Sequence, residues 1–175
     1  AAALIVVLAA SFLRRWRRDR MQDAVVNGDI VSLRELVSKG YDPNMELVGG
    51  HTPLTKACLY DRMVVVRYLL RSGADPNSCW DGRPALFIGM LYGGTDMALL
   101  LLENGADPNW ACERNYLIPI VMAAQFEYEE VVEDLIRRGA NVNVSNGDPG
   151  TPLHAAASAG SLELTRRFLD LGLSP

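Results

Sequence analysis

Stretches of apolar residues at helical spacing recur along the chain, and each ends at a glycine. Apolar side chains three and four positions apart indicate one buried face of a helix. A glycine directly after the last of them is typical of a helix C-terminus. We therefore expect a helix to end at each such glycine. Two of these stretches are Val65, Val66, Leu69 and Leu70 before Gly73, and Val131, Val132, Leu135 and Ile136 before Gly139.

The same glycine-led turn returns about every 33 residues. The sequence GADPN runs from Gly73 to Asn77 and again from Gly105 to Asn109, and looser copies begin at Gly40, Gly139 and Gly172. The leading glycines are 33, 32, 34 and 33 residues apart. A fixed period of this length is typical of repeat proteins, in which each unit is one supersecondary element.

A second signal lies 21 residues before each glycine from Gly73 onward and marks the start of a shorter helix, whereas the first unit, which ends at Gly40, lacks it. It reads Thr-Pro-Leu from Thr52 and from Thr151, and Pro84 and Ile118 hold the same place in the units between. Threonine caps a helix start, and proline at the first helical position loses no needed N–H. Polar or glycine breaks such as Tyr60-Asp61 and Gly93-Gly94 then separate this helix from the next. Each unit is therefore predicted to be a pair of short helices.

This pattern resembles the ankyrin repeat, which has a Thr-Pro-Leu-His start, a glycine break, a Val-Val-Leu-Leu second helix and a Gly-Ala-Asp-Val-Asn end. The resemblance covers about residues 21–175. It implies an all-α solenoid of helix–turn–helix units with loop or β-hairpin tips. One unit cannot bury its apolar helix face alone, so neighbouring units must stack to form the core. The expected repeats span approximately residues 21–47, 48–79, 80–113, 114–146 and 147–175, and an apolar helix over residues 1–20 lies outside the pattern.

Charge and cysteine content narrow the classes of function. The chain carries a net charge of −4, yet its residues 14–20 alone carry +4, so the body is acidic and is not expected to bind nucleic acid. The three cysteines, Cys58, Cys79 and Cys112, form no CxxC pair. They favour a reducing compartment over a disulfide framework. The chain begins without methionine and stops just after a turn signal, so we expect it to be a piece of a longer protein.

The sequence offers no pattern for catalysis, a cofactor or a metal. His51 and His154 have no partner at metal-ligand spacing, and His154 is expected to make a structural hydrogen bond between repeats. No phosphate-binding glycine loop is present. The acidic run Glu127 to Asp134 is interpreted as a solvated helix face with a Glu133–Arg137 pair. We therefore expect no enzyme in this segment.

By the resemblance, partners bind at the loop tips and at the exposed side of the first helices. Large aromatic residues at such places are typical of interface anchors, although each ring can instead fold back on its neighbouring loop. Tyr60, Tyr92 and Phe126 occupy the same position in successive repeats. Together they can form a binding surface, but packing within the repeats explains their positions equally well. The candidate partner-binding residues are Trp80, Asp81, Arg83, Trp110, Arg114 and Tyr116 in the loops, and Leu59, Tyr60, Tyr92 and Phe126 late in the first helices.

The first thirteen residues contain one polar residue, Ser11, and an arginine cluster follows directly. An apolar run that ends in arginines with an embedded tryptophan is typical of a membrane helix that reaches the headgroups. The candidate interface residues are Arg14, Arg15, Trp16, Arg17 and Arg18. Thirteen residues form about 20 Å of helix, which is shorter than a hydrocarbon core of about 30 Å. The run therefore also fits an arm that docks into a hydrophobic protein groove, or a remnant of a targeting segment.

Together these patterns predict a non-enzymatic, membrane-tethered scaffold for protein–protein interaction. The repeats are expected on the cytosolic side of the membrane or on its organellar equivalent, the stroma or matrix. Such a protein fits an accessory or recruiting subunit of a larger membrane assembly. Two alternatives remain open: the regulatory segment of a longer membrane enzyme or channel, and a soluble binder or inhibitor.

Overall fold

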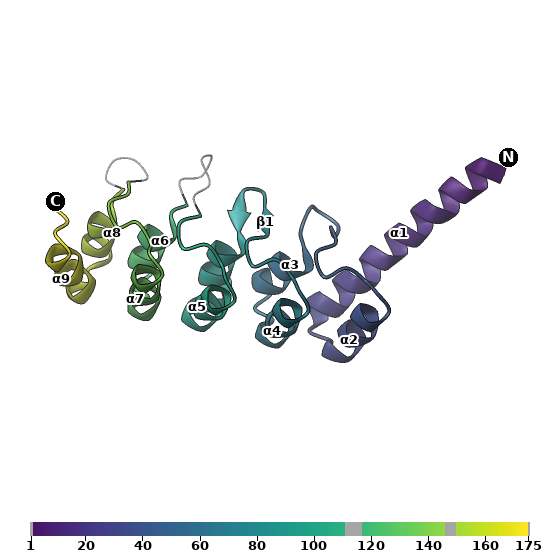
Figure 1. Cartoon of the computed structure of the whole chain (residues 1–175), viewed down its shortest axis with the longest axis horizontal. Coiled ribbons are helices and arrows are strands. Elements are labelled where there is room, and N and C mark those ends of the chain that lie inside the picture. The colour runs from purple at the N-terminus through teal and green to yellow at the C-terminus, as the bar shows by residue number, and fades with distance from the viewer. Residues whose placement is uncertain (1, 111–116, 146–149, 175) are drawn as a thin grey trace.

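The structure, a computed structural model, describes residues 2–110, 117–145 and 150–174, with side chains from residue 10 onward. Antiparallel helix pairs stack in a row, and loops project along one edge of the row (Figure 1). This arrangement confirms the predicted all-α solenoid. The elements are α1 (Ala2–Asn27), α2 (Ile30–Ser38), α3 (Pro53–Leu59), α4 (Met63–Arg71), β1 (Cys79–Trp80), β2 (Arg83–Pro84), α5 (Ala85–Glu103), α6 (Pro119–Gln125), α7 (Glu129–Arg137), α8 (Pro152–Ala159) and α9 (Leu162–Asp170).

Threonine side chains cap the first helices where the sequence supplies them. The Thr52 hydroxyl accepts a hydrogen bond from the Thr55 backbone N–H at 3.2 Å, and the Thr55 hydroxyl accepts one from the Thr52 N–H at 2.9 Å. This reciprocal pair is a capping box. Thr151 caps α8 in the same way, through the N–H of His154 at 3.2 Å. Ile118 begins α6 with no side-chain cap.

The glycine after each second helix closes it with a left-handed turn. Gly73 has φ +88°, its N–H donates to the Leu70 carbonyl at 3.2 Å, and the Ala74 N–H donates to the Leu69 carbonyl at 2.9 Å. This is the Schellman pattern, which glycine permits because it has no Cβ. The same pair of bonds recurs after Gly40, Gly105, Gly139 and Gly172, as the sequence predicted.

The break between paired helices also uses positive φ, and α5 contains its own break. Gly94 (φ 68°, ψ −157°) interrupts α5, so that α5 is two helices of one repeat. Those angles lie in a region that is essentially open to glycine alone. At the same turn in two neighbouring repeats, Asp61 and Glu127 take φ values of +51° and +59° without being glycine.

Asparagine side chains link one repeat to the next along the turns. Asn77 Nδ2 donates to the Gly105 carbonyl at 3.2 Å, and its Oδ1 accepts from the Asp107 N–H at 2.7 Å. Asn44 and Asn109 make the equivalent pairs of bonds with the next turn. The last residue of GADPN is therefore the one that ties each turn to its successor.

The core is continuous through the stack and is formed between helices rather than within one repeat. The first helices pack side by side, α1 on α3, α3 on α5, and α6 on α8. Fully buried alanines, namely Ala57, Ala85, Ala123, Ala124 and Ala156, line these contacts. A small side chain at such a place lets the neighbouring helix approach closely. The buried cluster runs from Met21 to Leu173.

Helix α1 belongs to the stack at one end only. Met21 and Val25 are fully buried in the core, whereas every residue from Ala10 to Arg20 is exposed. The helix continues without interruption across this change and extends away from the row of repeats (Figure 1). We call residues 2–20 of α1 the arm.

Candidate protein-binding surface and N-terminal arm

Three large apolar side chains are exposed on neighbouring first helices. Tyr60, Leu91 and Tyr92 expose 43%, 47% and 52% of their surfaces. Tyr60 directly follows α3, the other two lie in α5, and these helices pack together. We call these three residues the front patch. The Lys56 ammonium lies 5.7 Å from the centre of the Tyr60 ring, so the patch joins apolar surface to positive charge.

The other candidates on the first helices contribute less exposed surface. Leu59 and Phe126 are half-buried and pack against the core. The Phe126 ring also contacts that of Tyr128, with centroids 5.5 Å apart. The Tyr128 hydroxyl donates to the Met90 carbonyl at 3.2 Å. Exposure therefore concentrates at the second and third repeats, a distinction that the repeat phase did not give.

Trp80 is folded back onto the neighbouring loop. Its ring stacks on His51 with centroids 4.0 Å apart and planes at 16°, and its Nε1–H donates to the Gly49 carbonyl at 2.8 Å. The Arg83 guanidinium lies 5.6 Å from the same ring. Of the two interpretations that the sequence left open, the geometry favours a ring that braces two loops. Whether it also contacts a partner stays a prediction.

The hairpin that carries Trp80 turns through Asp81 and Gly82. Their φ values, 50° and 70°, are both positive, as the type I′ turn of a two-residue hairpin requires. Asp81 is exposed at this tip. Among the remaining loop candidates, Trp110 is half-buried, and Arg114 and Tyr116 lie outside the described residues.

The histidines are structural groups. His51 is 4% exposed, and this burial, with a smaller effect of the Lys56 charge, lowers its pKa to about 4. His154 Nδ1 lies 2.6 Å from the hydroxyl of Thr151 in its own repeat. The described bond of His154 is therefore internal to its repeat, whereas the repeat pattern predicted a bond between repeats.

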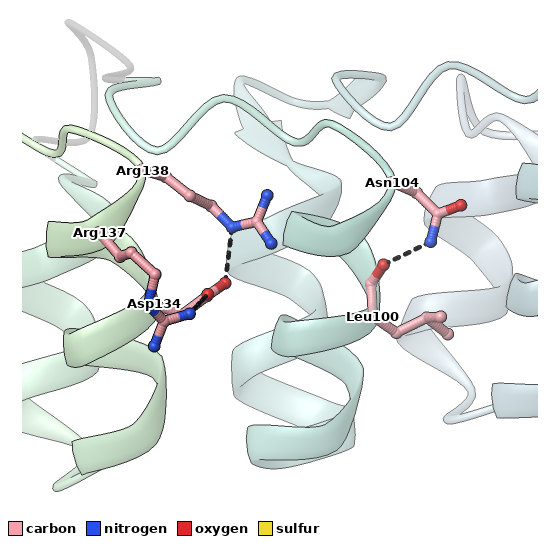
Figure 2. Close-up of polar contacts among 5 residues, drawn as sticks. All are labelled: Leu100, Asn104, Asp134, Arg137 and Arg138. Atoms are coloured by element: carbon pink, nitrogen blue, oxygen red, sulfur yellow. Dashed lines mark hydrogen bonds and ion pairs between the residues drawn. The ribbon is translucent and has the colours of Figure 1, made fainter.

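The acidic run around α7 is partly solvated, since Glu127, Glu129 and Glu130 are exposed, and partly paired. Asp134 is 5% exposed and binds Arg137 at 2.5 Å and Arg138 at 2.7 Å (Figure 2). Glu133 pairs with Arg167 of the next repeat at 2.6 and 3.0 Å, which lowers the pKa of Glu133. Arg137 itself bonds to Asp134, so the expected Glu133–Arg137 pair is not a direct contact, although the Arg137 charge contributes to lowering the pKa of Glu133. These groups line an open groove of about 600 Å³ over α5, α7 and α9.

The arm presents apolar and cationic side chains to solvent. Phe12, Leu13 and Trp16 expose 71%, 50% and 44% of their surfaces. The arginines of the predicted interface, Arg14, Arg15, Arg17 and Arg18, are all exposed; we call them the arginine collar. Arg17 lies 5.2 Å from the ring of Tyr41 in the first repeat.

A test of length and apolar content finds one candidate membrane span among the described residues, and it is not the arm. That helix is α5, of which 56% is buried inside the protein. Because α5 is largely buried and is interrupted at Gly94, it is interpreted as the two core helices of the third repeat. In the part of the chain that the structure describes, no group of three or more His, Cys, Asp or Glu residues is placed to hold a metal ion.

The fold and the repeated turn define a class of protein, and comparison with known proteins agrees. The pattern of the family described as ankyrin repeats (3 copies) matches residues 21–111 and 120–174. The chain belongs to the ankyrin repeat family. Such a domain is typically a non-enzymatic module for protein–protein interaction.

Individual relatives are much longer proteins. The chain is 31% identical to alpha-latrocrustotoxin-Lt1a of Latrodectus tredecimguttatus over 76% of its own length and 10% of that protein. It is 29% identical to human transient receptor potential cation channel subfamily A member 1, over 85% of the chain and 14% of the channel. The human ASB11 ankyrin repeat domain superposes with a TM-score of 0.72 at 26% identity, covering 88% of this chain and 69% of that one.

Proposed function

We propose that this protein is a membrane-tethered ankyrin adaptor, which binds a protein partner through its front patch while its arm inserts in a bilayer. The main support for membrane tethering is the exposure of the arm. Residues 10–20 are exposed throughout although they include Phe12, Leu13 and Trp16. A helix that carries its apolar residues on its outer surface needs an apolar environment, and a bilayer below the arginine collar supplies one.

The front patch supports the binding half of the proposal. Trp, Tyr and Arg dominate the residues that contribute most to binding energy, and two tyrosines of the front patch are more than two-fifths exposed. We propose further that the protein is an accessory or recruiting subunit of a larger membrane assembly, with the repeats on the cytosolic, stromal or matrix side, where the arginine collar is retained.

Flotation on lipid vesicles tests the tether. We expect the whole chain to float with vesicles after both high salt and alkaline wash, because salt releases only charge-driven binding. Val7→Asp combined with Phe12→Asp places charges in the hydrocarbon layer and should abolish flotation. Val31→Asp is the control, since Val31 is 73% exposed on α2, away from the arm. Equal flotation of the double variant, or loss of the whole chain at high salt, would contradict insertion.

One observation favours a second candidate, the regulatory segment of a longer channel. Both human transient receptor potential subfamily A member 1 and the Drosophila melanogaster channel pyrexia resemble this chain, which covers 14% and 12% of them. The coding sequence beyond residue 175 separates the candidates. Several further apolar spans of about 20 residues support the channel segment, whereas a short polar tail supports the adaptor.

A further inference from the structure

The arm and the loop tips lie at the same edge of the stack. In the described repeats each tip precedes a first helix, so the loop before α3 and the hairpin before α5 project beyond the N-terminal ends of those helices. The arm is the N-terminal extension of α1, which packs beside α3. Figure 1 shows the hairpin and the N-terminus on one side of the row. We call the loop 47–51 and the hairpin 79–84 the tip edge.

The arm leaves the stack on the side of the tip edge, but at a slant. Figure 1 shows that α1 rises on the side of the projecting loops while it also runs outward from the first repeat. The apolar residues 2–13 are the part of the arm that lies farthest from the stack.

No hinge separates the arm from the repeats. Helix α1 runs as one helix from Ala2 to Asn27, and Met21 and Val25 at its far end are fully buried in the core of the first repeat. A rotation of the arm would therefore break helical hydrogen bonds or expose core residues, each of which costs free energy. Arg17 also contacts Tyr41 of the first repeat, which fixes the collar against the stack.

We propose that the bilayer fixes the orientation of the whole stack, with the tip edge facing the lipid headgroups. This inference rests on the proposed insertion of the arm. Because the arm is rigid, insertion of its apolar end brings the edge of the stack from which it extends close to the membrane surface. The front patch lies at the opposite ends of the first helices, near Tyr60 and Tyr92. It therefore faces water and suits a partner domain that approaches from the aqueous side.

Energy transfer to the membrane surface tests this orientation. Cys79 is an exposed thiol in β1 at the tip edge, whereas Cys58 is buried, so Cys79 takes a dye in a chain with Cys112→Ser. For the opposite edge, Val64→Cys is labelled in a chain with Cys79→Ser and Cys112→Ser, because Val64 is 66% exposed at the start of α4. Both chains are bound to vesicles that carry acceptor dye on a fraction of their headgroups.

We expect transfer from position 79 to exceed transfer from position 64 by at least twofold. A Gly-Gly-Ser-Gly insertion between Arg18 and Asp19 should keep flotation and remove the difference, because it frees the stack from the arm. Equal transfer from the two positions in the parent chain, or more from position 64, would overturn the proposed orientation. A difference that persists in the insertion variant would overturn the rigid coupling. If the parent chain does not float at all, the proposed insertion itself fails.

Discussion

At the scale of single residues, His51 holds two loops together by being neutral and buried. It stacks on Trp80, and its Nδ1 lies 3.5 Å from the Thr55 hydroxyl. The positive charge of nearby Lys56 disfavours protonation of the His51 ring, which would place a second positive charge beside it. The repeat pattern allowed Trp80 to fold onto the neighbouring loop but did not identify His51 as its partner, because the two residues are 29 positions apart and belong to different repeats. Only the stacking of repeats brings them together.

We predict that His51 makes the protein less stable as the pH falls. Its pKa is about 4 in the folded protein and about 6.5 in the unfolded chain. The unfolded state therefore binds a proton first, so stability is full above about pH 6.5 and falls progressively toward pH 4. His51→Phe keeps a ring against Trp80 but has no proton to bind. Melting temperatures between pH 7.5 and 4.5 should fall less for this variant; parallel curves would contradict the prediction.

At the scale of elements, the third repeat depends on close packing of glycines against Met97. A Cβ at Gly93 would lie 2.6 Å from Met97 Cβ, and one at Gly89 would lie 2.7 Å from Leu101 Cδ1. The sequence allowed the break at Gly93-Gly94 to be predicted, since paired glycines stop helices. It did not show this contact, because the closeness of two helices depends on their packing and not on their pattern.

We predict that Gly93→Ala destabilises the protein more than Gly89→Ala. At Gly93 the new methyl meets a Cβ that is fixed to the backbone, whereas at Gly89 it meets the ends of flexible side chains. Overpacking of this kind costs about 1–3 kcal/mol. Urea unfolding of the two variants measures the difference directly. A Gly93→Ala protein as stable as Gly89→Ala would show that α5 relaxes more easily than its geometry indicates.

At the scale of the whole molecule, the repeats act as one body because their turns and outer helices are cross-linked. The asparagine bonds join successive turns, and Glu133–Arg167 joins α7 to α9. The repeat pattern placed each asparagine correctly, since spacing alone identifies the turn. It could not choose between Arg137 and Arg167 as the partner of Glu133, because the second lies in another repeat.

We predict that Asn77→Ala weakens the stack more than Asn104→Ala. Asn77 makes two bonds to the next repeat, whereas Asn104 makes one bond to Leu100 in its own helix (Figure 2). A net hydrogen bond contributes about 1 kcal/mol. Thermal unfolding should therefore show a loss of about 2 kcal/mol for Asn77→Ala. Equal losses would mean that the turns contribute little to coupling between repeats.

The fluorescence of Trp16 shows whether the arm enters a bilayer up to its arginine collar. Trp16 is 44% exposed within the collar, and its signal is the difference between the spectra of the whole chain and of Trp16→Phe. If the arm inserts, vesicles should shift this difference spectrum to the blue, and lipids brominated near the headgroup should quench it. A difference spectrum that vesicles leave unchanged, while the repeats stay folded, would rule out insertion of the arm.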